Sequence, residues 1–352
     1  MQHSIFASTI RSFFISLSAL LGVGLGLFLI IFFFVLLFGG VDEEMKVKTH
    51  YNPTIVANAE DVRQSLSQSA PVIMKINIGG LIGTDRLNTH SIRQQLVESR
   101  EGVLKNNRVK ALLIHLNTPG GTVIDSDGIY QAIKEYKEHF KVPVYAYVDG
   151  ICASGGMYVA AAADKIYASD VSIIGSIGVL SPPFFNLSQL MEKVGIEGKT
   201  LFAGKGKDDL NPFRPWKPGE DAHFQTLLDD FYQQFVQIIV ENRPEVSRSR
   251  LVNDYGANVF PASKAVEYGF IDGVDNSLND TIKQLAKEVG IEDDYYQVVK
   301  MERKFWLSQF FAEDSPLMNG VLRHNVELIP ELDAKMMNQF LYLYLPNFYP
   351  RG

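Results

Sequence analysis

The chain has 352 residues, of which 46% are hydrophobic and 21% are charged, which allows one large domain or two small ones plus a membrane segment. Its formal net charge of -7 at pH 7 argues against nucleic acid or an anionic lipid surface as the main partner. The single cysteine, Cys152, excludes an intramolecular disulfide, so the stability of the fold must come from its core.

Residues 12–41 contain no charged side chain. As a helix, this run is longer than the roughly 30 Å thickness of a bilayer's hydrocarbon core. It ends in two glycines and a valine, a poor cleavage site, so we expect an uncleaved single-pass anchor in the lipid bilayer. Arg11 precedes the run and acidic residues follow it. The positive-inside rule then predicts residues 1–11 in the cytoplasm and the rest on the extracytoplasmic side of the plasma (inner) membrane.

Residues 42–70 are polar and predict a tether, and residues 71–290 predict the globular domain. Runs of β-branched and other apolar residues indicate strands over 72–78, 109–116 and 142–148. Apolar residues spaced three and four apart, or runs of small residues, predict helices over 91–105, 124–140, 154–163, 187–194 and 220–243. Strands that alternate with helices predict an α/β fold with a largely parallel sheet.

Two glycine-rich corners follow predicted strands, at the end of the sheet where such folds place their sites. The first is 117–121, with Pro119 before two glycines, and the second is 152–156, with Ser154 before two glycines. Taken alone, each pattern is more often an ordinary turn or helix cap. Together they could set a serine nucleophile beside backbone N–H groups that hold an oxyanion, as acyl transfer requires.

A serine nucleophile needs a base, and no histidine lies between residues 140 and 222. A lysine can serve instead if its amine is kept neutral. Since an unperturbed lysine has a pKa near 10.4, burial would have to lower it by about three units. Lys199, Lys205 and Lys207 are the downstream candidates, and spacing alone does not choose among them. A basic, glycine-rich loop is also, by default, a solvated loop.

A series of motifs along the chain resembles the signal peptide peptidase A family in its single-copy form. The matching segments occupy residues 117–121, 153–158, 163–168, 174–179, 203–207 and 265–272. The resemblance spans roughly residues 70–290. It implies a crotonase-like ββα superhelix, the fold of the Clp proteases, and a serine endopeptidase that uses neither metal nor another cofactor.

The resemblance also implies roles for individual residues. It makes Ser154 the nucleophile, Lys207 the general base and Ser176 a hydroxyl that holds the lysine. The oxyanion donors would come from Gly120, Gly121 and Gly155. Departures from the family occur where this chain has Gly206 instead of an aromatic residue, His115 instead of Arg and Thr118 instead of Ser. Gly206 precedes the lysine, so Lys205 stays an alternative base.

In the family, the serine and the lysine come from different copies of a repeat. A single-copy chain therefore implies a ring-shaped homo-oligomer in which Lys207 acts in trans on a neighbour's Ser154. Small and apolar residues around the serine, such as Gly156 and Val159, favour apolar, extended peptides as substrates. Released signal peptides and membrane-protein fragments belong to that class.

Two other functions fit parts of the pattern. A crotonase-type acyl-coenzyme A enzyme would share the fold and the oxyanion corner, but it needs an acid/base carboxylate pair and a cytoplasmic site. A non-catalytic membrane scaffold of the same fold would need only the anchor and the surface. Reaction of Ser154 with a serine-directed probe separates the protease from both.

Residues 291–352 form a C-terminal extension in which the resemblance fades after about residue 300. One interpretation of the apolar end is a terminal helix packed on a neighbour. The other starts from alternation: Leu341, Leu343 and Leu345 share one face of a strand, and Phe340, Tyr342 and Tyr344 share the other. Such a strand could enter a peptide-cutting groove by strand addition, as an inhibitor or as a segment that the enzyme trims.

Overall fold

The computed structural model describes residues 5–38, 49–274, 277–291, 293–303 and 339–344. The chain divides into two compact units at residue 49. The first is formed by helix α1 (Ile5–Phe38). Within the described residues, its segment Arg11–Phe33 is the one helix long and apolar enough to cross a membrane. The last residues of the predicted run 12–41 lie outside the described part.

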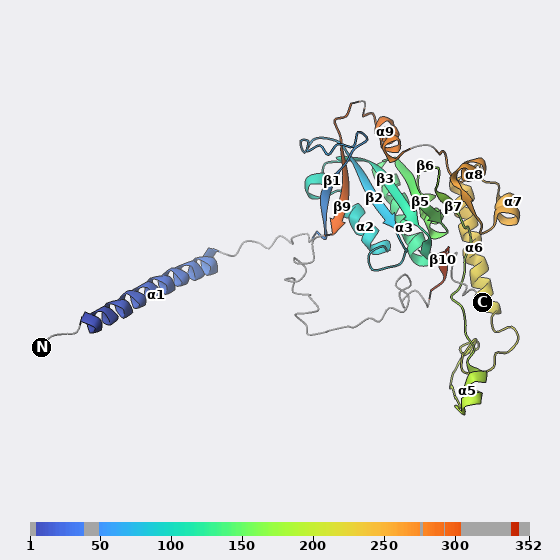
Figure 1. The fold of residues 1–352 in the computed structure, drawn as a ribbon, viewed down its shortest axis with the longest axis horizontal. Helices are drawn as coiled ribbons and strands as arrows, with labels where there is room; N and C mark the ends of the chain where they lie inside the picture. Colours follow the sequence, from blue (N-terminus) through green and yellow to red (C-terminus); the bar gives the residue numbers. More distant parts are fainter. Residues whose placement is uncertain (1–4, 39–48, 275–276, 292, 304–338, 345–352) are drawn as a thin grey trace. The chain divides into compact units, whose positions relative to one another are not determined.

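The second unit is built on an eight-stranded sheet (Figure 1). Its strands are β1 (Tyr51–Val56), β2 (Val72–Gly79), β3 (Val109–Thr118), β5 (Val144–Ala153), β6 (Lys165–Ala168), β7 (Ile173–Gly175), β8 (Val259–Pro261) and β9 (Gln297–Arg303). The order is β1-β9-β2-β3-β5-β7-β8, with β6 also paired to β5. All pairs from β9 to β7 are parallel, and only the edge strands β1 and β8 run antiparallel. The predicted α/β class with a largely parallel sheet is confirmed.

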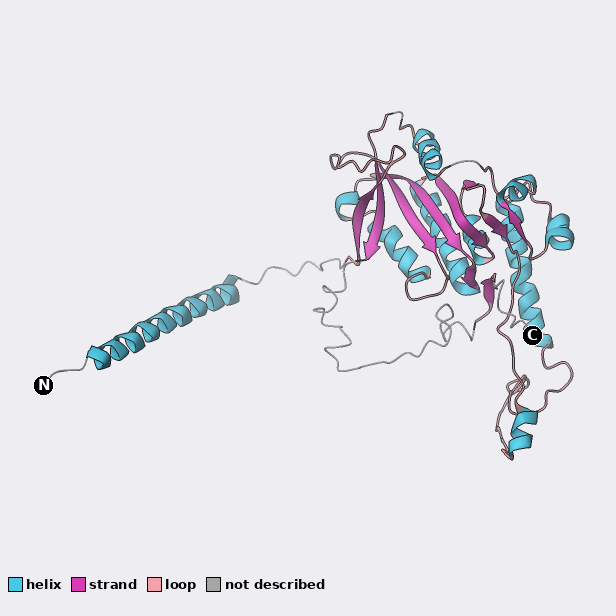
Figure 2. Ribbon diagram, in the orientation of Figure 1, coloured by secondary structure: helices cyan, strands magenta, loops and turns pink. Residues whose placement is uncertain are grey.

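Helices surround this sheet, although α5 lies apart from it, and most of them fall where the sequence predicts them (Figure 2). They are α2 (Thr89–Glu98), α3 (Val123–Phe140), α4 (Gly155–Ala160), α5 (Ser188–Val194), α6 (Ala222–Asn242), α7 (Arg248–Arg250), α8 (Ala262–Glu267) and α9 (Leu278–Glu288). The helix expected over 91–105 ends earlier, at Glu98. Glu101 is extended and Gly102 has a positive φ of 53°, which separates the helix from a 3-10 turn, Gly102–Leu104.

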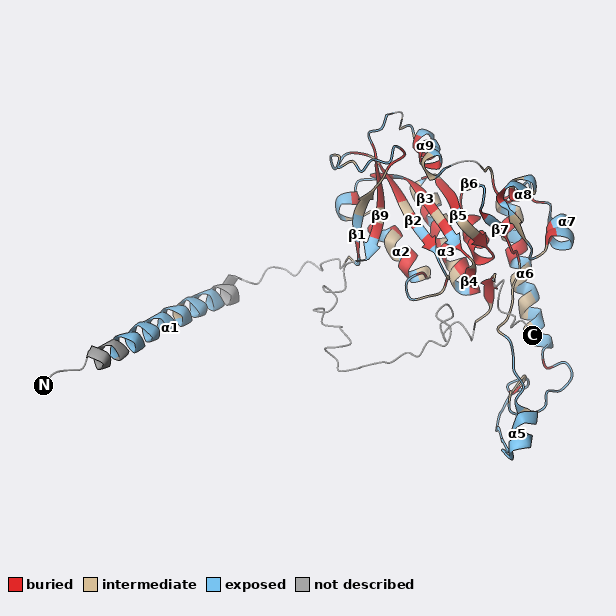
Figure 3. Cartoon of the chain, in the orientation of Figure 1, coloured by how far each residue is buried: buried red, intermediate tan, exposed pale blue. Residues whose placement is uncertain are grey.

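The central strands are buried on both faces, which explains their continuous apolar runs. Along β2, Met74 and Ile76 join the main core with α3 and α6, whereas Ile73 joins a second cluster under α9. Figure 3 shows buried residues concentrated along the strands and the helix faces turned toward them. Helix α5, in contrast, has no buried residue.

The sheet extends beyond the predicted limits of the globular domain at both ends. Strand β1 lies inside the predicted tether, and β9 lies inside the predicted C-terminal extension. The two pair with each other, Tyr51 opposite Arg303, across most of the chain's length. Because β1 is a half-exposed edge strand that contains Pro53, its sequence lacks the apolar run of a central strand.

Candidate active site

Ser154 lies at the junction between β5 and α4, with φ 54° and ψ -116°. A non-glycine residue in that region is strained by about 1–3 kcal/mol, and such strain is concentrated at functional sites. The backbone N–H of Ser154 donates to the Gly175 carbonyl at 2.8 Å and helps to hold this geometry. The hydroxyl oxygen Oγ donates to the Gly178 carbonyl over 3.4 Å, a weak bond that leaves it available for reaction.

Three glycines converge beside Ser154 because no side chain would fit there. A Cβ on Gly120 would lie 2.0 Å from the Tyr342 carbonyl oxygen and 2.7 Å from the Gly155 nitrogen. A Cβ on Gly155 would lie 3.2 Å from both the Gly121 nitrogen and the same Tyr342 oxygen. Gly120, with φ 101°, needs a conformation that L side chains rarely adopt. The bare backbone therefore surrounds one carbonyl oxygen of the tail.

That oxygen belongs to β10 (Leu341–Leu343), which pairs antiparallel with β4 (Gly120–Thr122). Tyr342 lies opposite Gly121. Two hydrogen bonds flank this pair: Val123 N–H donates to the Phe340 carbonyl, and Tyr344 N–H donates to the Pro119 carbonyl. In an antiparallel ladder, hydrogen-bonded pairs alternate with pairs that are not hydrogen-bonded. By that alternation Tyr342 and Gly121 form a hydrogen-bonded pair, which directs the Gly121 N–H toward the Tyr342 carbonyl.

The opposite edge of the tail strand bonds to Leu180. The two residues Leu341 and Leu180 exchange backbone hydrogen bonds of 2.9 and 3.0 Å. Leu341 and Leu343 pack near Leu81 and Leu180, while Tyr342 enters the main core. The strand alternation expected from the sequence is therefore confirmed for residues 341–343, and the terminal-helix interpretation is wrong for them.

The Tyr342 side chain is fully buried in an aromatic pocket. Its ring stacks on Tyr158 at 5.2 Å and lies 4.6 Å from the ring of Phe235, centroid to centroid. Its hydroxyl donates to the Phe231 carbonyl at 2.9 Å. Burial raises the pKa of Tyr342, so the phenol stays neutral. The pocket thus accommodates a large aromatic side chain and also provides a partner for its hydroxyl.

The two other predicted site residues lie in different surroundings. Ser176 is buried on the chain that leaves β7, with φ 57°, and its N–H donates to the Asn258 carbonyl at 2.7 Å. Lys207 is exposed, in the long loop between α5 and α6. Within the part of the chain that the structure describes, its amine bonds to no side chain, and the same holds for Lys205. One copy of the chain thus brings Ser154 and the glycines together but not the lysine.

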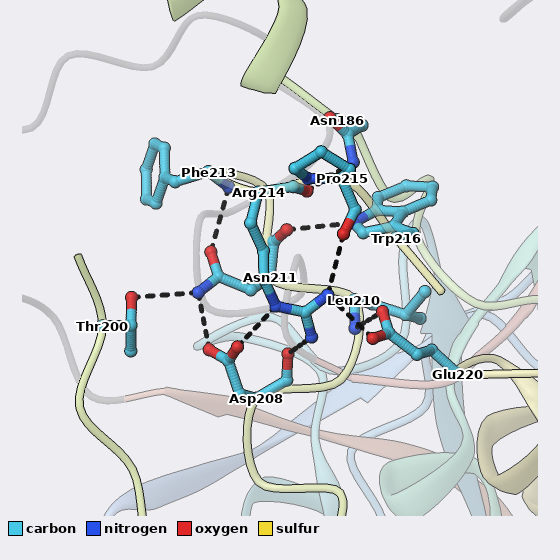
Figure 4. A network of polar contacts seen from close by, with 10 residues as sticks. All are labelled: Asn186, Thr200, Asp208, Leu210, Asn211, Phe213, Arg214, Pro215, Trp216 and Glu220. Atoms are coloured by element: carbon cyan, nitrogen blue, oxygen red, sulfur yellow. Dashed lines mark hydrogen bonds and ion pairs between the residues drawn. The ribbon is translucent and has the colours of Figure 1, made fainter. Parts of the chain in front are cut away.

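A polar network that the sequence did not suggest begins at the residue after Lys207 (Figure 4). Arg214 binds the Asp208 carboxylate through Nε at 2.5 Å and the Glu220 carboxylate through Nη1 at 2.7 Å. Asn211 binds the other Asp208 carboxylate oxygen at 2.6 Å. Hydrogen bonds from Arg214 and Asn211 lower the pKa of Asp208. Asp208, Arg214 and Glu220 follow each other at intervals of six residues, a spacing that belongs to neither a helix nor a strand, so the sequence did not indicate that they pair.

Comparisons with known proteins show which families the chain resembles. The profile of Peptidase family S49 matches residues 122–292, and that of Clp protease matches residues 66–172. A Synechocystis sp. protein named "Putative protease" is 33% identical over 210 residues, which are 58% of this chain and 74% of that protein. The "Putative signal peptide peptidase SppA" of Enterococcus faecium is 27% identical over 77% of this chain and 80% of that protein.

Two further similarities are weaker in coverage or in geometry. The chloroplastic serine protease SPPA of Arabidopsis thaliana is 34% identical over 52% of this chain, but only 27% of that protein is covered. Among solved structures, a ClpP1 mutant of Listeria monocytogenes superposes with a TM-score of 0.40 and 16% identity, over 59% of this chain and 94% of the other.

The family profile and the relatives named as proteases assign this fold to the class of serine proteases. Within that class, the chain belongs to peptidase family S49, the signal peptide peptidase A family.

Proposed function

We propose that this chain is a membrane-anchored serine endopeptidase in which Ser154 is the nucleophile and Lys207 is the general base. The observation that carries the proposal is the tail strand, which lies as a peptide beside Ser154 with one carbonyl oxygen among Gly120, Gly121 and Gly155. A substrate bound in the same way has its scissile carbonyl among those glycines. The bond to be cut then follows the residue in the aromatic pocket.

The chemistry follows from these positions. The Ser154 Oγ attacks the carbonyl carbon while the Lys207 amine takes the hydroxyl proton. The N–H groups of Gly121 and Gly155 hold the negative charge that develops on the carbonyl oxygen. The lysine then gives its proton to the leaving amine, and water hydrolyses the acyl-enzyme by the same steps in reverse order. Ser176 holds the lysine amine during these transfers.

The lysine comes from a second copy of the chain in this proposal, and the long loop that carries it supports this. Within the described residues, the segment around α5 exposes several large apolar side chains, namely Phe184, Phe185, Leu190, Val194, Leu201 and Phe202. So many exposed apolar side chains in one segment are typical of an interface. A neighbour that covers this segment would also receive Lys207, and repetition of that head-to-tail contact closes a ring.

The substrate class is extended, apolar peptides, such as released signal peptides and membrane-protein fragments. Strand addition to β4 requires an unfolded segment. The residue before the cut enters the pocket of Tyr158 and Phe235, which suits a large apolar or aromatic side chain. Helix α1 serves as the anchor, with the amino terminus in the cytoplasm, and it keeps the protease beside its substrates.

A fluorophosphonate probe tests this function directly. We expect the full-length protein to be labelled at Ser154, because only an activated serine reacts, and Ser154→Ala to remove the label. Neither an acyl-coenzyme A enzyme nor a scaffold predicts that result. A properly folded protein that takes no label at Ser154 would rule the proposal out.

A further inference from the structure

A lysine base works only while its amine is neutral, and a nearby carboxylate favours the protonated amine. Lys207 is followed directly by two carboxylates, Asp208 and Asp209. A free carboxylate there would hold a proton on the base. In the structure, Arg214 and Asn211 bind the Asp208 carboxylate, so that it is not free to bind the lysine amine.

Both oxygens of the Asp208 carboxylate are already bound inside the loop (Figure 4). Oδ2 accepts from Arg214 Nε at 2.5 Å, and Oδ1 accepts from Asn211 Nδ2 at 2.6 Å. The side chain is 8% exposed, whereas Lys207, one residue earlier, is exposed. The acid is therefore enclosed by its partners in the loop, whereas the base is exposed.

Arg214 is fixed in turn from several sides. Its Nη1 binds the Glu220 carboxylate at 2.7 Å, and its Nη2 donates to the Asp208 backbone carbonyl. Its own carbonyl accepts from Asn186 at 2.9 Å, which ties it to the start of α5. Arg214 thus donates hydrogen bonds to both the side chain and the backbone of Asp208, the residue next to Lys207. A guanidinium can do this with its planar fork of donors, which a lysine lacks.

We propose that Arg214 is a positioning residue for Lys207: by binding Asp208 it keeps the neighbouring carboxylate off the base and fixes the turn that presents it. The inference rests on the proposed function, in which Lys207 is the base. The charged groups of the turn that carries Lys207 and of the following loop are Lys205, Asp208, Asp209, Arg214, Lys217 and Glu220.

The test is the pH dependence of kcat/KM for a peptide substrate, measured on the full-length assembled protein. Arg214→Gln releases Asp208, so the rising limb of the profile should move up by about 0.5–1 pH unit. At a fixed pH on the acidic side of that limb, kcat/KM of the variant should be about three- to tenfold lower than that of the native protein. The double variant Arg214→Gln/Asp208→Asn removes the released charge and should return the limb toward its original position.

Glu220→Gln is the matched control, because it removes the other carboxylate on Arg214 and leaves Asp208 bound. It should leave the limb within a few tenths of a pH unit. An Arg214→Gln profile that drops equally at every pH, or a double variant that does not return, would overturn the positioning role. Failure of the proposed function looks different: Lys207→Ala would then keep its activity and the original limb.

A second variant keeps the test decisive if Arg214→Gln does not assemble. Asp208→Asn alone removes a charge that is already neutralised, so it should leave the limb nearly unmoved. A large downward shift of the limb in Asp208→Asn would mean that Asp208 acts on the base in the native protein, contrary to the proposal.

Discussion

At the scale of single residues, the roles of Ser154 and Lys207 can be separated from those of their neighbours. Ser154→Ala and Lys207→Ala should each lower kcat/KM by at least about 10³-fold, because both side chains act in one proton transfer. Lys205→Ala is the matched control and should keep most of the activity. Peptide-cleavage assays on correctly assembled protein check this. An inactive Lys205→Ala with an active Lys207→Ala would reverse the assignment.

Gly120 gives a second residue-scale prediction. A Cβ at this position would meet the carbonyl oxygen of any strand bound as the tail is, so Gly120→Ala should abolish cleavage. The positive φ adds a strain of about 1–3 kcal/mol. Gly102→Ala isolates the strain, since Gly102 also has a positive φ but open space around it. Thermal unfolding should show a loss of stability for both Gly120→Ala and Gly102→Ala, whereas only Gly102→Ala should still cleave peptides.

At the scale of elements, strand β10 pairs with β4 where the proposed function places the substrate. Tyr342→Ala removes the buried ring and the hydroxyl bond to Phe231, so the tail should leave the groove more often. Population shift then predicts a rise of at least about threefold in cleavage of short peptides at low concentration. Tyr344→Ala, in the same segment but only half-buried, should change the rate less. Equal rates for the native protein and Tyr342→Ala would make the tail a structural element only.

The elements also show what the sequence could and could not predict. The central strands β2, β3 and β5 were recognisable because burial on both faces leaves a local apolar run. Strands β1 and β9 were not, because each is stabilised by a partner more than 200 residues away in the chain, as Tyr51 and Arg303 show. For β10 the alternation was readable, whereas its partner β4 was not.

In the candidate site, too, some features could be predicted from the sequence and others could not. The glycines at 120, 121 and 155 stand out in the sequence because only backbone fits where they meet. The strain at Ser154 could not be read from the sequence, since serine gives no signal of a positive φ. The Arg214 network was also missed, because its members follow no helical or strand period and the loop looks solvated.

At the scale of the whole molecule, the proposed mechanism needs more than one copy. A single copy holds Ser154 beside the glycines that the proposal assigns to the oxyanion, but its Lys207 is exposed on a loop without a bond to Ser154 within the described residues. Of the exposed apolar side chains around α5, Leu201 and Phe202 lie in the same loop as Lys207, and the others lie in α5 or just before it. A neighbour that covers them would complete the site, so the active form should be an oligomer and dilution to monomers should abolish cleavage.

The central claim, a site that two copies share, is tested most directly by mixing two inactive proteins. Ser154→Ala supplies a lysine and Lys207→Ala supplies a serine, so co-assembled rings should contain native sites at some interfaces. For equal and random mixing, we expect recovery of about a quarter of the native activity, since a site needs the right copy on both sides. Mixed rings that are verified by mass spectrometry and yet remain inactive would contradict the account.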